Sequence, residues 1–189
     1  LKESNWTENN IVREYFFTDG RKLIGNKRGK RYFVDYLLSF KNTNLAIVEA
    51  KADDKDPLDG LQQSINYAQK LKDFVYATNG LKIFEHSLIE GNGKWIDSYP
   101  TPQELFERKF GKIDTKVETT ITYPFHLEDG MKPRFYQQIA VQKAIEAIAN
   151  NKDRVLLTLA TGTGKTYIAF QIVYRLFQSK WNKDGSNRR

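Results

Sequence analysis

Runs of β-branched and aromatic residues, each ended by turn-forming residues, follow one another from Ile11 to about Phe110. This pattern is typical of strands separated by short turns. We predict strands over 11–17, 31–40, 45–51, 74–80 and 81–88. The residues Lys-Asn-Thr-Asn at 41–44 favour a turn, so 31–40 and 45–51 are expected to pair as an antiparallel hairpin. The strand at 81–88 is expected to pair with 74–80 in the same way.

One amphipathic helix interrupts these strands. Its apolar residues at 61, 65, 68 and 71 recur at helical spacing, so we predict a helix over 61–73 after an acidic loop at 53–60. The segment 90–102 is expected to be a loop, and a short helix is expected to follow a cap near Thr101. The order of strand, strand, helix and strand favours a mixed α/β layer fold over an all-β barrel.

The pattern changes after residue 110. The segment 111–132 is polar without a clear period, and we interpret it as a linker or a cover segment. Beyond it, apolar spacing predicts a helix over 134–151, a fully apolar strand over 155–160 and an amphipathic helix over 167–179. A strand, a loop and a helix in this order begin a second domain. The predicted division is therefore 1–110, 111–132 as linker, and 133–189.

Composition narrows the class of protein. A hydrophobic content of 40% with 28% charged residues fits a soluble globular chain, and 30 basic against 23 acidic residues give a net charge of +7, which suits a polyanionic partner. The absence of cysteine excludes disulfides and cysteine-ligated zinc and fits a reducing cytosol. No apolar run approaches the ~20 residues of a membrane span. Because the sequence begins with Leu1 rather than Met, we expect further residues upstream.

The sequence Ala-Thr-Gly-Thr-Gly-Lys-Thr at 160–166 lies between the predicted apolar strand and the helix that follows it. Backbone N–H groups of a glycine-rich loop, together with a helix N-terminus, form a site for phosphate. In such a loop the lysine, here Lys165, reaches the β- and γ-phosphates, and the hydroxyl of Thr166 helps to hold Mg²⁺. The alternative is a plain glycine turn before a helix, which the agreement of strand, loop and helix disfavours.

The general phosphate-loop pattern has a glycine where Leu159 stands, so this sequence misses it by one position. The loop instead resembles motif I of the superfamily 2 helicases and translocases. The upstream Arg-x-Tyr-Gln of residues 134–137 also resembles an element in which a glutamine contacts adenine. The ATP-binding residues that this resemblance implies are Gln137, Gly162, Thr163, Gly164, Lys165 and Thr166. The sequence to Arg189 holds no Asp-Glu-x-x metal motif, so we expect these residues alone not to hydrolyse ATP.

Acidic residues and a lysine occupy the predicted hairpin. Asp35 lies in its first strand, and Glu49 and Lys51 lie on one face of its second strand, because side chains two positions apart share a face. Two carboxylates supply hard oxygen ligands for Mg²⁺, and a neighbouring lysine can stabilise developing negative charge or position a water. The pattern is degenerate, and its alternative is a solvated strand face with a surface ion pair.

Further residues favour the nuclease interpretation. Gln63 and Tyr67 lie four positions apart, and hence on one face of the predicted helix. The strings Val-Asp-Tyr-Leu-Leu, Ala-Ile-Val-Glu-Ala-Lys-Ala, Gln-Gln-Ser-Ile-Asn-Tyr-Ala and Tyr-Ala-Thr-Asn-Gly occur in that order. Together they resemble the N-terminal nuclease domain of type I restriction enzyme R subunits, a PD-(D/E)xK-like family with an added Gln-x-x-x-Tyr element.

The resemblance implies a restriction-endonuclease-like mixed sheet flanked by helices, followed by the beginning of a RecA-like parallel α/β motor domain. It implies that Asp35 and Glu49 bind Mg²⁺, that Lys51 is catalytic and that Gln63 and Tyr67 lie near DNA. The family usually starts with a helix that bears another acidic residue, which we expect to precede this sequence. In type III subunits the nuclease follows the motor, whereas here it comes first.

The implied activity is Mg²⁺-dependent cleavage of double-stranded DNA with ATP-driven translocation. A methyltransferase and a specificity subunit are the implied partners in the bacterial or archaeal cytoplasm, without a membrane. The alternative is a translocase whose nuclease-like domain only binds DNA or partners.

The loop before 31–40 is a solvated turn or a contact to the DNA backbone. Its basic residues are Arg21, Lys22, Lys27, Arg28, Lys30 and Arg31.

Overall fold

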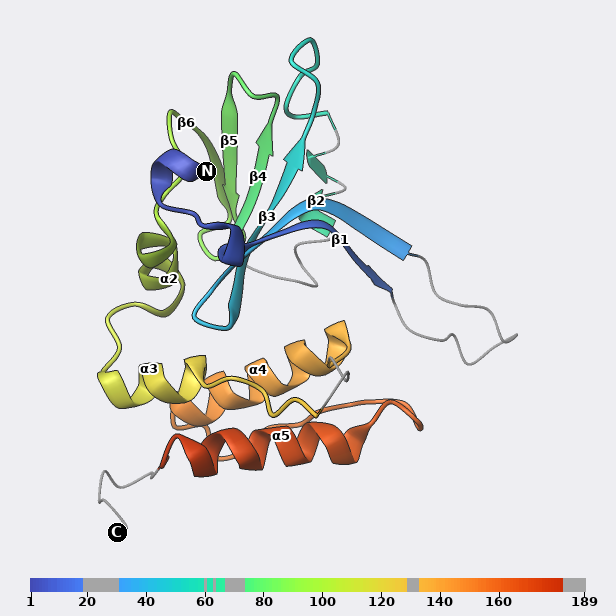
Figure 1. Cartoon of the computed structure of the whole chain (residues 1–189), viewed down its shortest axis with the longest axis vertical. Coiled ribbons are helices and arrows are strands. Elements are labelled where there is room, and N and C mark those ends of the chain that lie inside the picture. Colours follow the sequence, from blue (N-terminus) through green and yellow to red (C-terminus); the bar gives the residue numbers. More distant parts are fainter. Residues whose placement is uncertain (19–30, 60, 63, 67–73, 129–132, 182–189) are drawn as a thin grey trace. The chain divides into compact units, whose positions relative to one another are not determined.

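The computed structural model describes residues 1–18, 31–59, 61–62, 64–66, 74–128 and 133–181 (Figure 1). The chain forms two compact units, which are described separately. The first comprises Leu1–Phe40 and Asn44–Lys112, and the second comprises Lys41–Thr43 and Ile113–Arg189. In the described part of the chain no helix is long and apolar enough to cross a membrane.

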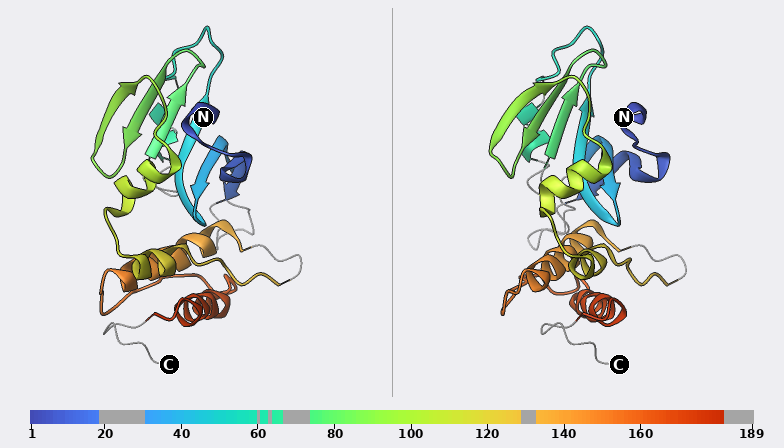
Figure 2. Two further views of the ribbon diagram at one scale, coloured as in Figure 1. Left: turned by 60° about the vertical axis from the view of Figure 1, so that its left-hand side comes forward. Right: turned by 90° about the vertical axis from the view of Figure 1, so that its left-hand side faces the viewer.

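A six-stranded mixed sheet forms the first unit, and its strands follow one another in space in the order of the sequence (Figures 1 and 2). The strands are β1 Ile11–Thr18, β2 Arg31–Phe40, β3 Thr43–Ala50, β4 Phe74–Thr78, β5 Ile83–Ser87 and β6 Asn92–Ile96. Strands β3 and β4 are parallel, whereas β1 pairs antiparallel with β2, β4 with β5, and β5 with β6. A parallel pair requires a long crossover. Here the crossover contains the helical residues 61–62 and 64–66.

The predicted hairpin is confirmed. Strands β2 and β3 are neighbours joined only by Lys41 and Asn42, whose φ angles of 48° and 59° are those of the tight turn that matches strand twist. The prediction of a loop over 90–102 is wrong, because β6 lies within it. Gly93, which made this stretch look irregular, is required there, since a Cβ would lie 2.5 Å from the Phe84 ring.

The centre of the sheet is buried on both faces. Residues 45–48 of β3 and 74–77 of β4 are at most 2% exposed, so these strands are continuously apolar rather than alternating. The helix α2, Pro102–Phe110, begins at the predicted cap, where Thr101 and Glu104 form a capping box. Leu105 and Phe106 of α2 are buried.

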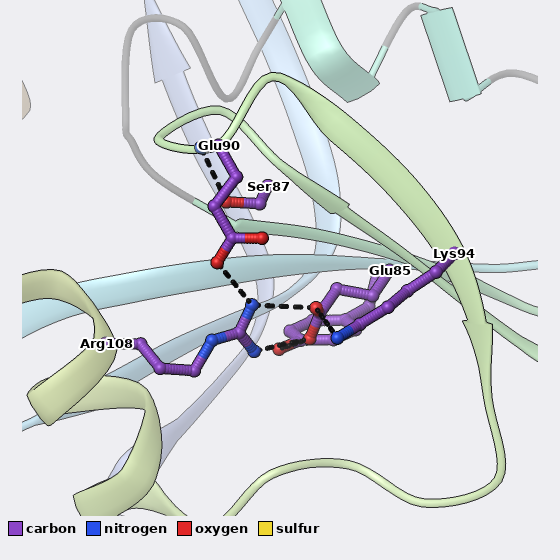
Figure 3. A network of polar contacts seen from close by, with 6 residues as sticks. Glu85, Ser87, Glu90, Lys94 and Arg108 are labelled. Atoms are coloured by element: carbon purple, nitrogen blue, oxygen red, sulfur yellow. Dashed lines mark hydrogen bonds and ion pairs between the residues drawn. The ribbon is translucent and has the colours of Figure 1, made fainter.

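A buried ion-pair network joins α2 to the sheet (Figure 3). Both carboxylate oxygens of Glu85 accept hydrogen bonds of 2.8 Å from the guanidinium of Arg108, and the buried Tyr76 hydroxyl donates to Glu85 Oε2, also at 2.8 Å. Lys94 lies 3.8 Å from Glu85, and Glu90 lies 3.5 Å from Arg108. Burial raises the pKa of Glu85, but the hydrogen bonds from Arg108 and Tyr76 outweigh it, so the pKa is lower than usual.

This lowered pKa predicts acid destabilisation of the first unit. A carboxylate whose pKa is depressed by folding contributes stability above its unfolded pKa of about 4.3, and this stability is lost as the pH falls through the folded value. In a Glu85→Gln variant, we expect the unfolding free energy to depend less on pH below about pH 4. Urea unfolding at several pH values measures it, and an unchanged slope against pH would contradict the assignment.

Three helices form the described secondary structure of the second unit: α3 Thr115–Thr122, α4 Phe135–Ala149 and α5 Lys165–Gln178. The helices α4 and α5 agree with the prediction, whereas α3 lies within the segment interpreted as a linker. Its threonines obscure the helical pattern, because they are poor helix formers without an apolar stripe. The Asp114 side chain caps α3 by accepting from Lys116 N and Val117 N.

Residues 155–160 do not form the predicted strand. Leu156 is 90% exposed. A strand is stabilised by a hydrogen-bonded neighbour, and among the described residues of the second unit there is no strand for it to pair with. Apolar character alone therefore did not produce a strand here.

Arg175 is the buried polar centre of the second unit. Its guanidinium donates to the carbonyls of Thr120 and Ile121 at the end of α3 and to Gln142 Oε1, while its Nε has no partner among the described residues. Burial lowers the pKa of Arg175 to about 10. A cation at the C-terminal end of a helix satisfies carbonyls that lack a partner within the helix.

Candidate functional site

The first candidate site lies where β2 and the end of β3 meet. Asp35 Oδ2 accepts a hydrogen bond of 2.7 Å from the backbone N–H of Ala50. Ala50 stands between Glu49 and Lys51 in the sequence. The carboxylate of Asp35 is therefore held against the end of β3 that carries Glu49 and Lys51, as the sequence predicted for adjacent strands of a hairpin.

Glu49 and Lys51 form an ion pair of 2.8 Å, with side chains 18% and 29% exposed. The hydrogen bond to Glu49 raises the pKa of Lys51, and the negative charges of Glu49, Asp35 and Asp59 raise it further. Lys51 is thus a cation among three carboxylates. Asp59 was not predicted to belong to this site, because the sequence placed it only in an acidic loop.

The backbone around this cluster is fixed by β4 and the turn after it. The N–H of Lys51 donates to Thr78 O at 2.7 Å, which extends the pairing of β3 with β4 beyond Ala50. The amide of Asn79 donates to the carbonyls of Asp53 and Lys55 at 3.2 and 3.0 Å and so holds the acidic loop. This role of Asn79 could not be predicted from the sequence, because a turn asparagine has no distinctive spacing.

The carboxylates of Asp35 and Glu49 fit a magnesium ion by their chemistry. The described residues contain no group of three or more histidine, cysteine or acidic side chains able to hold a metal. Mg²⁺, however, is usually held by one or two carboxylates and takes its other ligands from water and phosphate. Asp35 Oδ1 and Glu49 Oε2 accept no hydrogen bond from the described residues, which leaves each carboxylate one oxygen for an ion.

Several predicted residues lie outside the described ranges. These are Gln63 and Tyr67 of the added nuclease motif, and Arg21, Lys22, Lys27, Arg28 and Lys30 of the basic loop. Arg31 begins β2, but its side chain is also outside the description. Their assignments stay predictions.

The second candidate site is the glycine loop before α5. Gly162 and Gly164 have φ angles of 73° and 81°, a region that side chains disfavour, and Gly164 is the N-cap of α5. A Cβ at Gly164 would lie only 2.6 Å from Gln137 Nε2, so a side chain there would displace the Gln137 amide from its position. Lys165 Nζ donates to the carbonyls of Leu159 and Ala160, at 3.1 and 3.3 Å.

The first turn of α4 holds this loop. The carbonyl of Thr163 accepts hydrogen bonds from the Tyr136 hydroxyl at 3.1 Å and from Gln137 Nε2 at 3.0 Å. Gln137 Oε1 accepts from the backbone N–H of Arg134 at 2.8 Å. Because one partner is a carbonyl and the other an N–H, the orientation of the Gln137 amide is fixed.

A cavity of about 280 Å³ opens between this turn and the loop. Its lining residues are Pro133, Arg134, Gln137, Gly162, Thr163, Gly164 and Tyr167. The structure thus brings together four of the six predicted ATP-binding residues, while Lys165 and Thr166 are exposed beside them. The sequence analysis did not name Arg134 and Tyr136, although both belong to the Arg-x-Tyr-Gln element.

Comparison with known proteins finds relatives among restriction enzymes. Residues 130–185 match the family model of the type III restriction enzyme res subunit. The chain is 36% identical over 198 residues to the type I restriction enzyme EcoAI endonuclease subunit of Escherichia coli, covering 97% of this chain and 24% of that protein. It is 25% identical to the EcoKI endonuclease subunit of E. coli strain K12, covering 82% of this chain and 17% of that protein.

A solved structure is also similar. It is a fragment assigned as an HsdR subunit of a type I restriction enzyme from Vibrio vulnificus YJ016, with a TM-score of 0.87 and 39% identity over all of this chain and 38% of that one. The present chain spans about a quarter of the length of the first curated relative. The mixed α/β fold with its six-stranded sheet is confirmed by this likeness. Close homologues of this chain are thus the endonuclease (HsdR) subunits of type I restriction enzymes, and it corresponds to part of such a subunit.

Proposed function

We propose that the first unit is a Mg²⁺-dependent endonuclease for double-stranded DNA and that the second binds ATP for DNA translocation. The observation that carries the nuclease proposal is the hydrogen bond from Ala50 N to Asp35 Oδ2, which brings Asp35 to the Glu49–Lys51 end of β3. Similarity to the relatives supports it, because they are endonuclease subunits.

In the nuclease proposal, each group has one task. Asp35 and Glu49 hold Mg²⁺ through the carboxylate oxygens that remain free. The bound ion supplies charge neutralisation at the phosphate and lowers the pKa of a water. Lys51, held by Glu49 at 2.8 Å, places a positive charge where negative charge develops on the phosphate. Gln63 and Tyr67 are proposed to lie near the DNA.

The basic residues of the β1–β2 loop are proposed to contact the DNA backbone. Such contacts give affinity that depends on salt but not on sequence. Target choice would then come from a specificity subunit, which we propose as a partner together with a methyltransferase subunit, in the bacterial cytoplasm. The net charge of +7 supports a polyanionic substrate.

The ATP proposal rests on the glycine loop and the cavity beside it. Gln137 uses one N–H and one lone pair of its amide within the protein. One N–H and one lone pair stay available, and these match the N7 acceptor and the N6 donor of adenine. Gln137 can therefore hold the loop and contact adenine at once. Lys165 would exchange its carbonyl partners for phosphate, and Thr166 would contribute to Mg²⁺ binding.

A Lys51→Ala variant in the assembled restriction complex tests the nuclease proposal. We expect the rate of DNA cleavage to fall about 100-fold, because one positioned cation is lost at the reacting phosphate. ATP-driven translocation should continue at the wild-type rate. Cleavage of supercoiled plasmid and displacement of a triplex-forming strand measure the two activities separately.

Lys82→Ala is the matched control, because Lys82 is an exposed lysine on the turn between β4 and β5. This variant should cleave at the wild-type rate. If Lys51→Ala also cleaves at that rate, the nuclease assignment is wrong, and the domain serves only to bind DNA or partner subunits.

A further inference from the structure

Tyr136 contacts the glycine loop, but it is not among the six predicted ATP-binding residues. Its hydroxyl lies 3.1 Å from the carbonyl oxygen of Thr163, and Gln137 Nε2 lies 3.0 Å from the same oxygen. The first turn of α4 thus directs two donors at one loop carbonyl. We infer that Tyr136 is a positioning residue for nucleotide, holding the Thr163–Gly164 peptide so that the Gly164 N–H faces the phosphates; this inference rests on the proposed ATP binding.

The direction of the Tyr136 hydrogen bond follows from its other neighbour. Arg134 Nη1 lies 3.2 Å from the Tyr136 oxygen, and a guanidinium can only donate. The hydroxyl therefore accepts from Arg134 and must donate its proton to Thr163 O. A cation on the accepting side strengthens the donation, because hydrogen bonds in a chain polarise one another.

The geometry of the peptide bond transfers this restraint to Gly164. The described peptide bonds are all trans, and in a trans peptide the C=O and the following N–H point in opposite directions. Fixing the Thr163 oxygen toward α4 thus turns the Gly164 N–H away from α4. No described residue accepts a hydrogen bond from this N–H, which stands at the start of α5.

Such an N–H at the beginning of a helix is the donor type that glycine loops present to phosphate. Gly164 has a φ of 81°, and glycine can leave such an angle more easily than other residues because it lacks the Cβ that restricts them. The same freedom that lets the loop close around phosphate would let this N–H turn away. The clamp from Tyr136 removes that freedom before nucleotide arrives.

A Tyr136→Phe variant of the full chain tests the inference, because it removes only the hydroxyl. We expect affinity for MgATP and for magnesium tripolyphosphate to fall by the same factor, about five- to tenfold, since the change concerns phosphates and not the base. The ¹⁵N–¹H resonance of Gly164, observed with glycine-selective labelling, should shift less on addition of MgATP than in the wild type. Thermal stability should be unchanged.

Two other variants separate the possible failures. Tyr174→Phe removes a hydroxyl elsewhere on the partner helix α5 and should bind MgATP like the wild type. Lys165→Ala should abolish binding, and if it does not, the ATP proposal itself fails. If Lys165→Ala loses binding but Tyr136→Phe keeps wild-type affinity and the full Gly164 shift, or loses affinity for ATP but not for tripolyphosphate, the positioning role is wrong.

Discussion

Replacing Glu85 with alanine is expected to lower the free energy of unfolding of the first unit by about 3 kcal/mol. The variant leaves the buried Tyr76 hydroxyl without a described acceptor and removes the bidentate partner of the partly buried Arg108. The Tyr76 hydroxyl, on a residue with no exposed surface, loses its only described acceptor, and Arg108 loses both 2.8 Å hydrogen bonds to a carboxylate. Removing one member of a buried pair costs far more than the pair contributes, because the remaining charge stays desolvated.

Arg108 has one way to recover part of this loss. Glu90 already lies 3.5 Å from its guanidinium, and this carboxylate is about half exposed (Figure 3). We therefore place the expected loss at the lower end of the range for buried pairs. The cost of the unpaired Tyr76 hydroxyl cannot be recovered in this way.

Chemical denaturation and native-state hydrogen exchange of the β4 and β5 amides measure the effect. Glu90→Ala is the matched control, and its loss should stay below about 0.5 kcal/mol, as is typical of exposed ion pairs. If both variants lose equal stability, the network does not depend on the buried carboxylate. Glu85→Gln should lie between them, since an amide oxygen still accepts from Tyr76.

The burial of Glu85 could not be predicted from the sequence. In the predicted strand over 81–88, Glu85 lies between Phe84 and His86, and this local pattern fits a solvent-facing position as well as a buried one. Its burial depends on α2, which lies beyond β6 in the sequence and brings Arg108 to β5. Local pattern carries no information about such a distant partner.

Elements that depend on local chemistry were predictable. The turn at Lys41 and Asn42, the cap at Thr101 and the start of α5 at the glycine loop each follow from residues within one turn of the feature. Two of the failures have the opposite property. Strand β6 depends on packing of Gly93 against the Phe84 ring, and 155–160 lacks a described neighbour. In both cases a nonlocal contact decides the structure.

The candidate sites divide in the same way. Glu49 and Lys51 share a strand face by spacing alone, and the structure pairs them. That Asp35 reaches the end of β3 depends on the register of the hairpin, which its turn fixes. The clamp of Tyr136 on Thr163 joins two segments 27 residues apart and had no signal beyond the Arg-x-Tyr-Gln element.

An Asp35→Asn variant is expected to reduce DNA cleavage by the assembled complex about 1,000-fold, an increase of about 4 kcal/mol in the barrier. Asparagine removes the charge without removing the local hydrogen bond. Its amide oxygen can still accept from Ala50 N, as Asp35 Oδ2 does. The end of β3 should therefore keep its place, while the negative charge proposed to hold Mg²⁺ disappears.

Three measurements make the experiment decisive. Stability should stay within about 0.5 kcal/mol of the wild type, since the local hydrogen bond is kept. Cleavage should remain low over a Mg²⁺ titration, whereas ATP hydrolysis by the complex should be unaffected. Asp54→Asn makes the same chemical change in the exposed acidic loop, where the side chain is 70% exposed, and should cleave normally.

The position of the remaining charge explains why the loss should be so large. With Asp35 neutral, Glu49 is the only one of the two proposed ligands that keeps its charge, and one of its oxygens is engaged by Lys51 at 2.8 Å. One carboxylate that is also engaged by Lys51 holds Mg²⁺ more weakly than two carboxylates, so the ion is less often in place at the phosphate. If Asp35→Asn cleaves at the wild-type rate at low Mg²⁺, Asp35 is not a ligand, and its carboxylate serves only to hold the Ala50 backbone.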